Sequence, residues 1–231
     1  MTILNDTHAF YENHAHDYFA RTKDADMTAL LGRFAELLPD GAVVLDVGCG
    51  SGRDLRWFAE HGYRAVGIDA SEALCGLARG YAGPEAEVRS CTIEDWTAER
   101  AGSGDRYEED PWDPDFMYGG IWANASLLHL SEEDLFAYFR AAASRLAPGG
   151  VLFFSMKEDA GGAAGADAGP GAKIFTDGEG RFFRLFDGDD LSAVLMRTSS
   201  LSMVDSWTTP DSMGRDVVWR NVLLKRRKWL V

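Results

Sequence analysis

The chain has 231 residues, of which 46% are hydrophobic, and this is enough for one sizeable core. The composition excludes disorder, collagen and coiled coil as descriptions of the whole chain. The formal net charge of −14 argues against nucleic-acid binding, because phosphate binding requires a positively charged face.

The cysteines and the apolar runs indicate the cellular compartment of the protein. Cys49, Cys75 and Cys91 are odd in number and lack a CxxC spacing, so neither a disulfide framework nor a zinc motif is expected. No apolar run approaches the roughly 20 residues of a membrane span. The first residues also lack the pattern of a signal peptide. These features predict a cytoplasmic protein, a monomer or homodimer, that binds a small molecule and neither nucleic acid nor membrane.

Helices and strands are predicted to alternate through the first part of the chain. Apolar residues at helical spacing predict a helix over 27–38, and the continuous apolar run 42–47 predicts a strand buried on both faces. The pattern continues with a helix over 54–61, a strand over 63–69, a helix over 72–81 and a strand over 86–91. This alternation is typical of a parallel sheet.

The second part of the chain ends differently. Strands are predicted over 119–125 and 151–156, with a helix between them that begins at Ser131 and ends before Pro148. A further helix from about Asp190 precedes two closing strands over 201–208 and 216–224. Because no helix separates these two strands, they predict an antiparallel hairpin. The glycine-containing segments 98–114 and 160–172 are predicted to be loops.

The predicted fold class is therefore α/β, with a Rossmann-like, doubly wound, seven-stranded sheet, a C-terminal antiparallel hairpin and an N-terminal helical cap. Residues 1–231 are expected to form a single domain. Within it, we expect the cap in residues 1–40 and the Rossmann-like core in residues 41–231.

A glycine-rich turn over 48–52 joins the first predicted strand to a helix. Glycine lets the backbone approach a ligand closely, and the start of the helix presents free N–H groups. The G-x-G-x-G pattern differs from the dinucleotide fingerprint G-x-G-x-x-G, because Arg53 occupies the position of the third glycine. An NAD(P)-dependent oxidoreductase is therefore the less favoured alternative.

Two carboxylates accompany this turn. Asp46 stands two residues before the first glycine, and Asp69 ends the next predicted strand. Strand ends in an open α/β sheet face the ligand crevice. Asp69 is suited to accept hydrogen bonds from ribose hydroxyls, and Asp46 to attract an ammonium group or position a water near it. A ligand with a ribose and a positively charged amino acid tail fits these residues better than a pyrophosphate does.

These residues resemble the class I S-adenosylmethionine-dependent methyltransferases, and the resemblance extends over residues 11–224. The motifs that carry it are LDVGCGSGRD at 45–54, GIDAS at 67–71, IED at 93–95, ANASLLH at 123–129 and LAPGG at 146–150. Within the family the chain is similar to the bacterial small-molecule methyltransferases that include the tellurite-resistance type. The resemblance implies a methyltransferase with S-adenosylmethionine as cofactor, S-adenosylhomocysteine as product and a small-molecule acceptor. A partner subunit that binds the cofactor without transferring methyl groups is the non-enzymatic alternative.

The same resemblance implies roles for the candidate cofactor-binding residues. It puts Gly48, Cys49 and Gly50 along the methionine part, Asp69 at the ribose, Ala70 and Leu74 beside the adenine, Thr92 and Ile93 at the adenine edge, and Asn124 and Ala125 near the sulfonium. Arg53 is close enough in sequence to reach the cofactor carboxylate, although Arg53 and Asp54 have the alternative of flanking and capping the helix. Cys49 is expected to pack under the loop rather than act as a nucleophile.

His129 is the candidate catalytic residue, because it follows the fourth predicted strand at the edge where the reacting atoms should lie. A histidine with an unperturbed pKa near 6.5 is suited to take a proton from a hydroxyl or amine, and the alternative is a histidine that shapes the pocket. Methyl transfer from a sulfonium often needs no strong base, since in-line positioning supplies much of the rate. The other histidines lack metal-ligand spacing, so no metal is predicted and surface positions are expected for His8, His14, His16 and His61.

Two aromatic segments are expected to enclose the acceptor. Tyr11 and Tyr18 belong to a segment that folds over the cofactor in relatives, and the alternative is an ordinary packed helix. Arg181 and Phe183 belong to the segment 181–186, which is expected to form the opposite wall or, alternatively, to fill a core.

Overall fold

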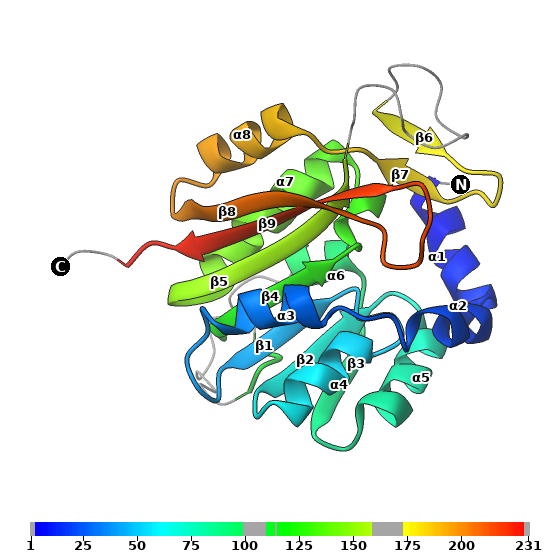
Figure 1. The fold of residues 1–231 in the computed structure, drawn as a ribbon, viewed down its shortest axis with the longest axis horizontal. Coiled ribbons are helices and arrows are strands. Elements are labelled where there is room, and N and C mark those ends of the chain that lie inside the picture. The colour runs from blue at the N-terminus through cyan, green and yellow to red at the C-terminus, as the bar shows by residue number, and fades with distance from the viewer. Residues whose placement is uncertain (1–2, 99–109, 114, 159–172, 229–231) are drawn as a thin grey trace.

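A seven-stranded sheet crosses the molecule in the order β3-β2-β1-β4-β5-β9-β8 (Figure 1). The computed structural model describes residues 3–98, 110–113, 115–158 and 173–228. The strands of the large sheet are β1 (Val43–Val47), β2 (Arg64–Asp69), β3 (Ala86–Ser90), β4 (Tyr118–Asn124), β5 (Leu146–Lys157), β8 (Leu201–Pro210) and β9 (Val218–Arg226). From β3 to β5 the neighbouring strands run parallel, whereas β9 pairs antiparallel with both β5 and β8. The predicted Rossmann-like fold with a C-terminal antiparallel hairpin is therefore confirmed.

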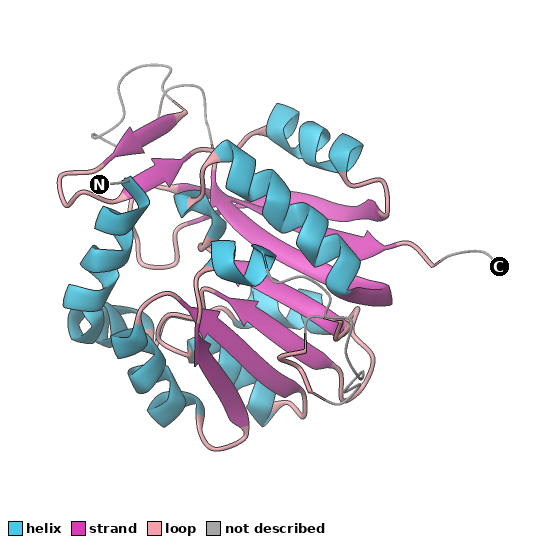
Figure 2. Ribbon diagram, turned by 180° about the vertical axis from the view of Figure 1, so that it is seen from behind, coloured by secondary structure: helices cyan, strands magenta, loops and turns pink. Residues whose placement is uncertain are grey.

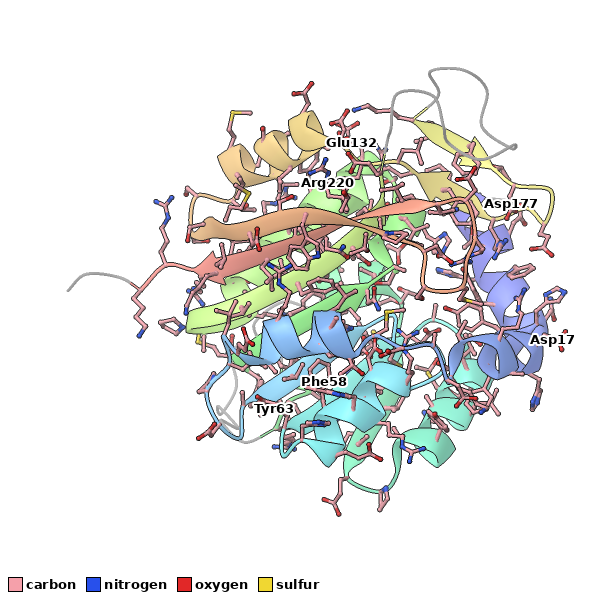
Figure 3. The ribbon with its side chains drawn as sticks, in the orientation of Figure 1. Asp17, Phe58, Tyr63, Glu132, Asp177 and Arg220 are labelled. Carbon is pink, nitrogen blue, oxygen red and sulfur yellow. The ribbon has the colours of Figure 1, made fainter. Side chains whose placement is uncertain are left out.

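Helices cover both faces of the sheet, as the opposite views in Figures 1 and 2 show. One face carries α3 (Thr28–Ala35), α4 (Arg53–Glu60) and α5 (Glu72–Ala82), and the other carries α6 (Ile93–Ala98), α7 (Glu132–Arg145) and α8 (Gly188–Arg197). Figure 3 shows Phe58 and Tyr63 beneath α3. Phe58 packs there on Phe34 and on Trp122, and all three side chains are fully buried. Burial of large aromatic side chains of this kind holds the helix layer on the sheet.

Two further helices, α1 (Ile3–Asn13) and α2 (Ala15–Thr22), form the predicted N-terminal helical cap together with α3. Both α1 and α2 pack against α5, and α1 also packs against β7 (Phe182–Arg184). Glu12 accepts a hydrogen bond of 2.6 Å from the Ser71 hydroxyl, and the Tyr81 hydroxyl donates to the Lys23 carbonyl at 2.9 Å. These polar contacts attach the cap to the carboxyl ends of the strands, where the predicted ligand loop lies.

The predicted start of α7 is confirmed by its capping geometry. The Ser131 hydroxyl accepts from the Asp134 backbone N–H at 3.2 Å and donates to the Asp134 carboxylate at 2.5 Å. This satisfies a backbone donor that the first turn of a helix otherwise leaves without a partner.

The structure differs from the predictions in three places. Strand β5 begins at Leu146 rather than at residue 151, because a register shift opposite Tyr118 and Gly120 lets the proline–glycine segment join the ladder. Phe182–Arg184 pairs with β6 (Ile174–Thr176) in a separate two-stranded antiparallel sheet that was not expected. The short helix α6 was not predicted either. The predicted loop over 160–172 and most of the one over 98–114 lie outside the described residues.

A search of the described residues finds neither a helix that is long and apolar enough to cross a membrane nor a group of side chains suited to hold a metal ion.

Candidate functional site

The turn between β1 and α4 follows a path that requires glycine. Gly48, Gly50 and Gly52 have φ values of 73°, 53° and 75°, in the left-handed region that other residues rarely adopt. The Gly48 N–H donates to the Ile68 carbonyl at 2.8 Å, so the turn lies against the end of β2. A Cβ atom at Gly48 would lie 2.4 Å from the Ser126 Cβ, which is closer than carbon atoms can approach. The glycines thus supply both the turn and the space beside it.

Asp69 holds this turn in place. One carboxylate oxygen accepts from the Gly50 N–H at 2.9 Å, and the other accepts from the Ser71 N–H at 2.9 Å. Burial raises the pKa of Asp69 above its ordinary value, while the hydrogen bonds from Ser71 and Gly50 oppose that shift. Each carboxylate oxygen has a second lone pair, so Asp69 retains the capacity to accept from two ligand hydroxyls.

A cavity of about 80 Å³, called here the glycine-loop cavity, lies between this turn, the cap and the ends of β2 and β4. It brings together ten of the candidate residues, namely Tyr11, Tyr18, Gly48, Gly50, Asp69, Ala70, Leu74, Ile93, Ala125 and His129. Its lining also contains six residues that were not predicted to belong to the site, namely Thr7, His8, Cys91, Glu94, Ser126 and Leu130. The expectation that His8 is a surface residue was wrong, because α1 folds over the cavity.

His129 is held in one tautomer by its two neighbours. Its Nδ1 lies 2.6 Å from the Phe182 carbonyl oxygen, which can only accept, so Nδ1 carries the proton. Burial lowers the pKa of His129 to about 4, although the hydrogen bond to Phe182 opposes the shift. The ring is therefore neutral at pH 7, and its Nε2 accepts from the Tyr11 hydroxyl at 3.0 Å. This geometry makes His129 a residue that orients Tyr11, and its expected catalytic role stays a prediction.

Acid titration of the folded protein tests this account of His129. The folded pKa of about 4 lies below the ordinary 6.5, so the unfolded state binds the proton first as the pH falls. The stabilisation is complete above pH 6.5 and is lost on the way to pH 4, by up to about 3 kcal/mol. We expect urea unfolding of His129→Gln to show a smaller loss of free energy over this interval than the wild type. Equal losses in the two proteins would contradict the neutral, buried imidazole.

Tyr11 and Tyr18 form the cap side of the cavity. Their rings pack edge to face with centroids 5.2 Å apart, and burial raises the pKa of both phenols. Both hydroxyls therefore stay protonated at neutral pH. Arg181 and Phe183 do not line the glycine-loop cavity. Phe183 lies in β7 behind this wall, with its ring 5.0 Å from that of His129, and Arg181, which precedes β7, pairs with Asp177.

Arg53 and Asn124 lie on the other side of Tyr18, where both contact a buried carboxylate. Arg53 donates to the two Asp54 oxygens at 2.6 and 2.9 Å. Asp54 also accepts from Trp122 Nε1 at 2.9 Å and from Asn124 Nδ2 at 3.2 Å. Burial alone would raise the pKa of Asp54, but the Arg53 charge and these hydrogen bonds lower it below its ordinary value. Asp54 thus orients two candidate cofactor-binding residues, a role beyond the helix cap that the sequence suggested.

Asp46, Cys49 and Thr92 also lie outside the glycine-loop cavity. Asp46 is 2% exposed, and burial together with the nearby negative charge of Asp54 raises its pKa well above the ordinary value. Cys49 is buried beneath the loop, as expected, and burial raises the pKa of its thiol, so it is unreactive at neutral pH. Thr92 accepts from the Asp95 N–H at 3.0 Å and caps α6.

Comparison with known proteins identifies the family of this architecture. A family model described as a methyltransferase domain matches residues 17–198. A ubiquinone biosynthesis O-methyltransferase of Xanthomonas axonopodis is 36% identical over 124 residues, which are 52% of this chain and 45% of that protein. One from Bordetella avium is 30% identical over 118 residues, which are 50% of this chain and 42% of that protein. The chain thus spans less than half the length of these curated relatives.

Solved structures agree in fold. The Burkholderia thailandensis 1,6-didemethyltoxoflavin-N1-methyltransferase superposes with a TM-score of 0.68 at 20% identity, over 97% of this chain and 88% of that one. The magnesium protoporphyrin IX methyltransferase of Synechocystis has a TM-score of 0.64 at 16% identity, over 98% of both chains. At these identities the likeness concerns the fold.

Proposed function

Because the chain belongs to the methyltransferase domain family, we propose that it is an enzyme that transfers a methyl group from S-adenosylmethionine to a small-molecule acceptor. The observation that carries this proposal is the meeting of Asp69, Gly48 and Gly50 in one cavity. A carboxylate beside a bare backbone loop suits a ribose with an amino acid tail. Ala70 and Leu74 give the same cavity an apolar surface for an adenine ring.

The fit of the residues supports this cofactor over a nicotinamide dinucleotide. Helix α4 begins at Arg53, which occupies the position of the third glycine of the dinucleotide fingerprint. The guanidinium of Arg53 is paired with Asp54. Asp69 would hold the ribose of the cofactor, and Asn124 would hold its amino acid end. Arg53, whose charge is paired with Asp54, would keep that carboxylate in place so that it orients Asn124. Cys49 would support the glycine-rich loop and Thr92 would support α6, both from outside the cavity.

When bound, the cofactor supplies a methyl group on a positively charged sulfur, and the acceptor's lone pair displaces the sulfur while the C–S electron pair stays on it. The chain's own contribution is to position the acceptor and to exclude water. Tyr11 and Tyr18 close the cap side with protonated hydroxyls, and His129 fixes the direction in which the Tyr11 hydroxyl points. The proton of an acceptor O–H or N–H would pass to solvent water after the methyl group has been transferred.

The acceptor that we propose is a small molecule methylated on oxygen. The printed function of the curated relatives, ubiquinone biosynthesis O-methylation, supports an oxygen acceptor, and the net charge of −14 argues against nucleic acid. Kinship with the tellurite-resistance type, and hence a softer acceptor atom, stays a secondary proposal. Cys49, Cys75 and Cys91, all among the described residues, form no disulfide, which supports the proposed cytoplasmic setting.

Calorimetry with S-adenosylhomocysteine tests the proposal. We expect the wild-type chain to bind this product, and Asp69→Ala to bind it more weakly by roughly 1–3 kcal/mol, because charge-assisted hydrogen bonds to the ribose are lost. Glu72→Ala is the matched control, since this exposed carboxylate pairs with Arg79 on the outer side of α5 and should leave the affinity unchanged. Binding of NAD(P) with no response to S-adenosylhomocysteine would reverse the choice of cofactor.

A further inference from the structure

A second and larger cavity, about 300 Å³ in volume, opens on the far side of Tyr18. It lies between the segment that joins α2 to α3 and the turn that joins β8 to β9, and we call it the β9 cavity. Tyr18 and Ala125 line both cavities, so the two spaces adjoin at these residues. A molecule in the β9 cavity would therefore lie next to one in the glycine-loop cavity.

The floor of the β9 cavity is a row of polar side chains on three neighbouring strands. Asn124 of β4 pairs in register with Ser155 of β5, and Ser155 pairs in register with Asn221 of β9. All three residues line the cavity. Ser155 and Asn221 are 2% and 0% exposed, so polar groups replace the apolar side chains that usually cover a sheet beneath helices. Burying such groups is costly unless they have hydrogen-bond partners.

Asn124 and Ser155 are hydrogen-bonded to each other, whereas Asn221 keeps one acceptor without a hydrogen bond. The Ser155 hydroxyl donates to Asn124 Oδ1 at 2.7 Å and accepts from the Ala125 N–H at 2.8 Å. Asn221 Nδ2 donates to the Thr209 hydroxyl at 3.0 Å and points to the Trp219 carbonyl at 3.5 Å. A carbonyl can only accept, and this long contact agrees with nitrogen at this end of the amide. Asn221 Oδ1 is then a buried acceptor to which no group among the described residues donates.

The walls of the β9 cavity indicate what kind of molecule fits. Its two arginines are already paired, Arg53 with Asp54 and Arg215 with Asp211, so neither offers an unpaired charge to an anion. Asp211 also accepts from Trp219 Nε1 at 2.9 Å and thereby fixes the indole as part of the wall. Apolar surface comes from Met27, Leu30 and Trp219.

We propose that the β9 cavity is the acceptor site and that its occupant is a small molecule without an anionic group, whose hydroxyl or amine donates a hydrogen bond to Asn221 Oδ1. This inference rests on the proposed methyltransferase function. It moves the acceptor away from the segment 181–186, which lines neither cavity. Asn221 is a binding residue in this proposal, and it touches the acceptor rather than the cofactor.

Two variants of the full-length chain test the assignment. Asn221→Leu replaces the amide by an apolar group of similar size, and Ala29→Phe fills the cavity from an exposed position on α3. Thr198→Val is the matched control, because it removes a buried hydroxyl at the end of α8 that lines neither cavity. Each protein receives S-adenosylmethionine with an isotopically labelled methyl group and a low-molecular-mass metabolite fraction as the acceptor probe. Mass spectrometry measures the labelled products, and calorimetry measures S-adenosylhomocysteine affinity.

We expect both cavity variants to form the wild-type labelled product at least about tenfold more slowly at limiting acceptor, because Asn221→Leu removes one hydrogen bond to the acceptor and Ala29→Phe takes up its space. Their affinity for S-adenosylhomocysteine, and both properties of Thr198→Val, should match the wild type. Unchanged transfer in both cavity variants, or a labelled product whose unmethylated form has neither hydroxyl nor amine, would overturn the acceptor site alone. A wild-type chain that neither binds S-adenosylhomocysteine nor transfers label would instead overturn the proposed function.

Discussion

Asp54→Ala is expected to lower the free energy of unfolding by about 3–5 kcal/mol, the cost of breaking a buried ion pair from one side. Asp54 is 4% exposed and is the paired carboxylate of Arg53. Its removal also leaves the buried Trp122 Nε1 without its acceptor. Urea unfolding should show a lower midpoint with an unchanged slope.

Asp205→Ala is the matched control for this prediction, since Asp205 also pairs with an arginine, Arg33, but both side chains are more than 40% exposed. Exposed pairs contribute about 0–1 kcal/mol. A loss in Asp54→Ala no larger than that in Asp205→Ala would contradict the view that Asp54 organises the buried side of the site.

Gly48→Ala is expected to weaken S-adenosylhomocysteine binding by at least about tenfold, the equivalent of 1.4 kcal/mol. The residue has a φ of 73°, and an added Cβ would meet the Ser126 Cβ at 2.4 Å, so the loop must move away from the cavity. Calorimetry measures this effect directly.

Gly62→Ala separates backbone strain from the steric clash. Gly62 has a φ of 82°, yet nothing lies within 4 Å of an added Cβ. We expect this variant to lose about 1–2 kcal/mol of stability from strain and to keep its affinity. Ser126→Gly combined with Gly48→Ala should restore part of the binding, because it removes the clashing atom. Equal affinities of Gly48→Ala and the wild type would refute the close fit of the loop.

The strands of the large sheet and its glycine-rich turn could be predicted because both depend on local patterns. The apolar run that becomes β1, the glycines that follow it and Asp69 at the end of β2 lie within a short stretch of sequence. Parallel pairing then brings the carboxyl ends of β1 and β2 to the same edge. Ser126 follows the candidate residue Ala125, and Cys91 ends the predicted strand over 86–91 just before the candidate Thr92, and that adjacency was the available signal for them.

Other features depend on contacts between distant parts of the chain. Tyr11 and His129 are 118 residues apart, and their hydrogen bond follows from how the cap folds over the sheet. Asn221 follows Arg220 in a strand of mixed polar and apolar residues, so the sequence gives it no distinguishing signal. Its place beside Ser155 depends on the register of β9 against β5, which local patterns do not determine.

The lowered pKa of His129 could not be predicted from the sequence either. An exposed histidine would titrate near 6.5, and only its burial and the Phe182 carbonyl make it a neutral hydrogen-bond acceptor. The same holds for Phe183, since the pairing of β6 with β7 places it behind the Tyr11 wall, and for Arg181, which precedes β7 and pairs with Asp177.

Transfer of an isotopically labelled methyl group by the isolated wild-type chain is the most direct test of the central claim. The chain is incubated with labelled S-adenosylmethionine and a metabolite extract, and mass spectrometry follows the label. We predict label in a small molecule, with S-adenosylhomocysteine released in equal amount, and no need for a second protein. Label found only in nucleic acid or protein, or transfer that appears only after a partner protein is added, would contradict the account.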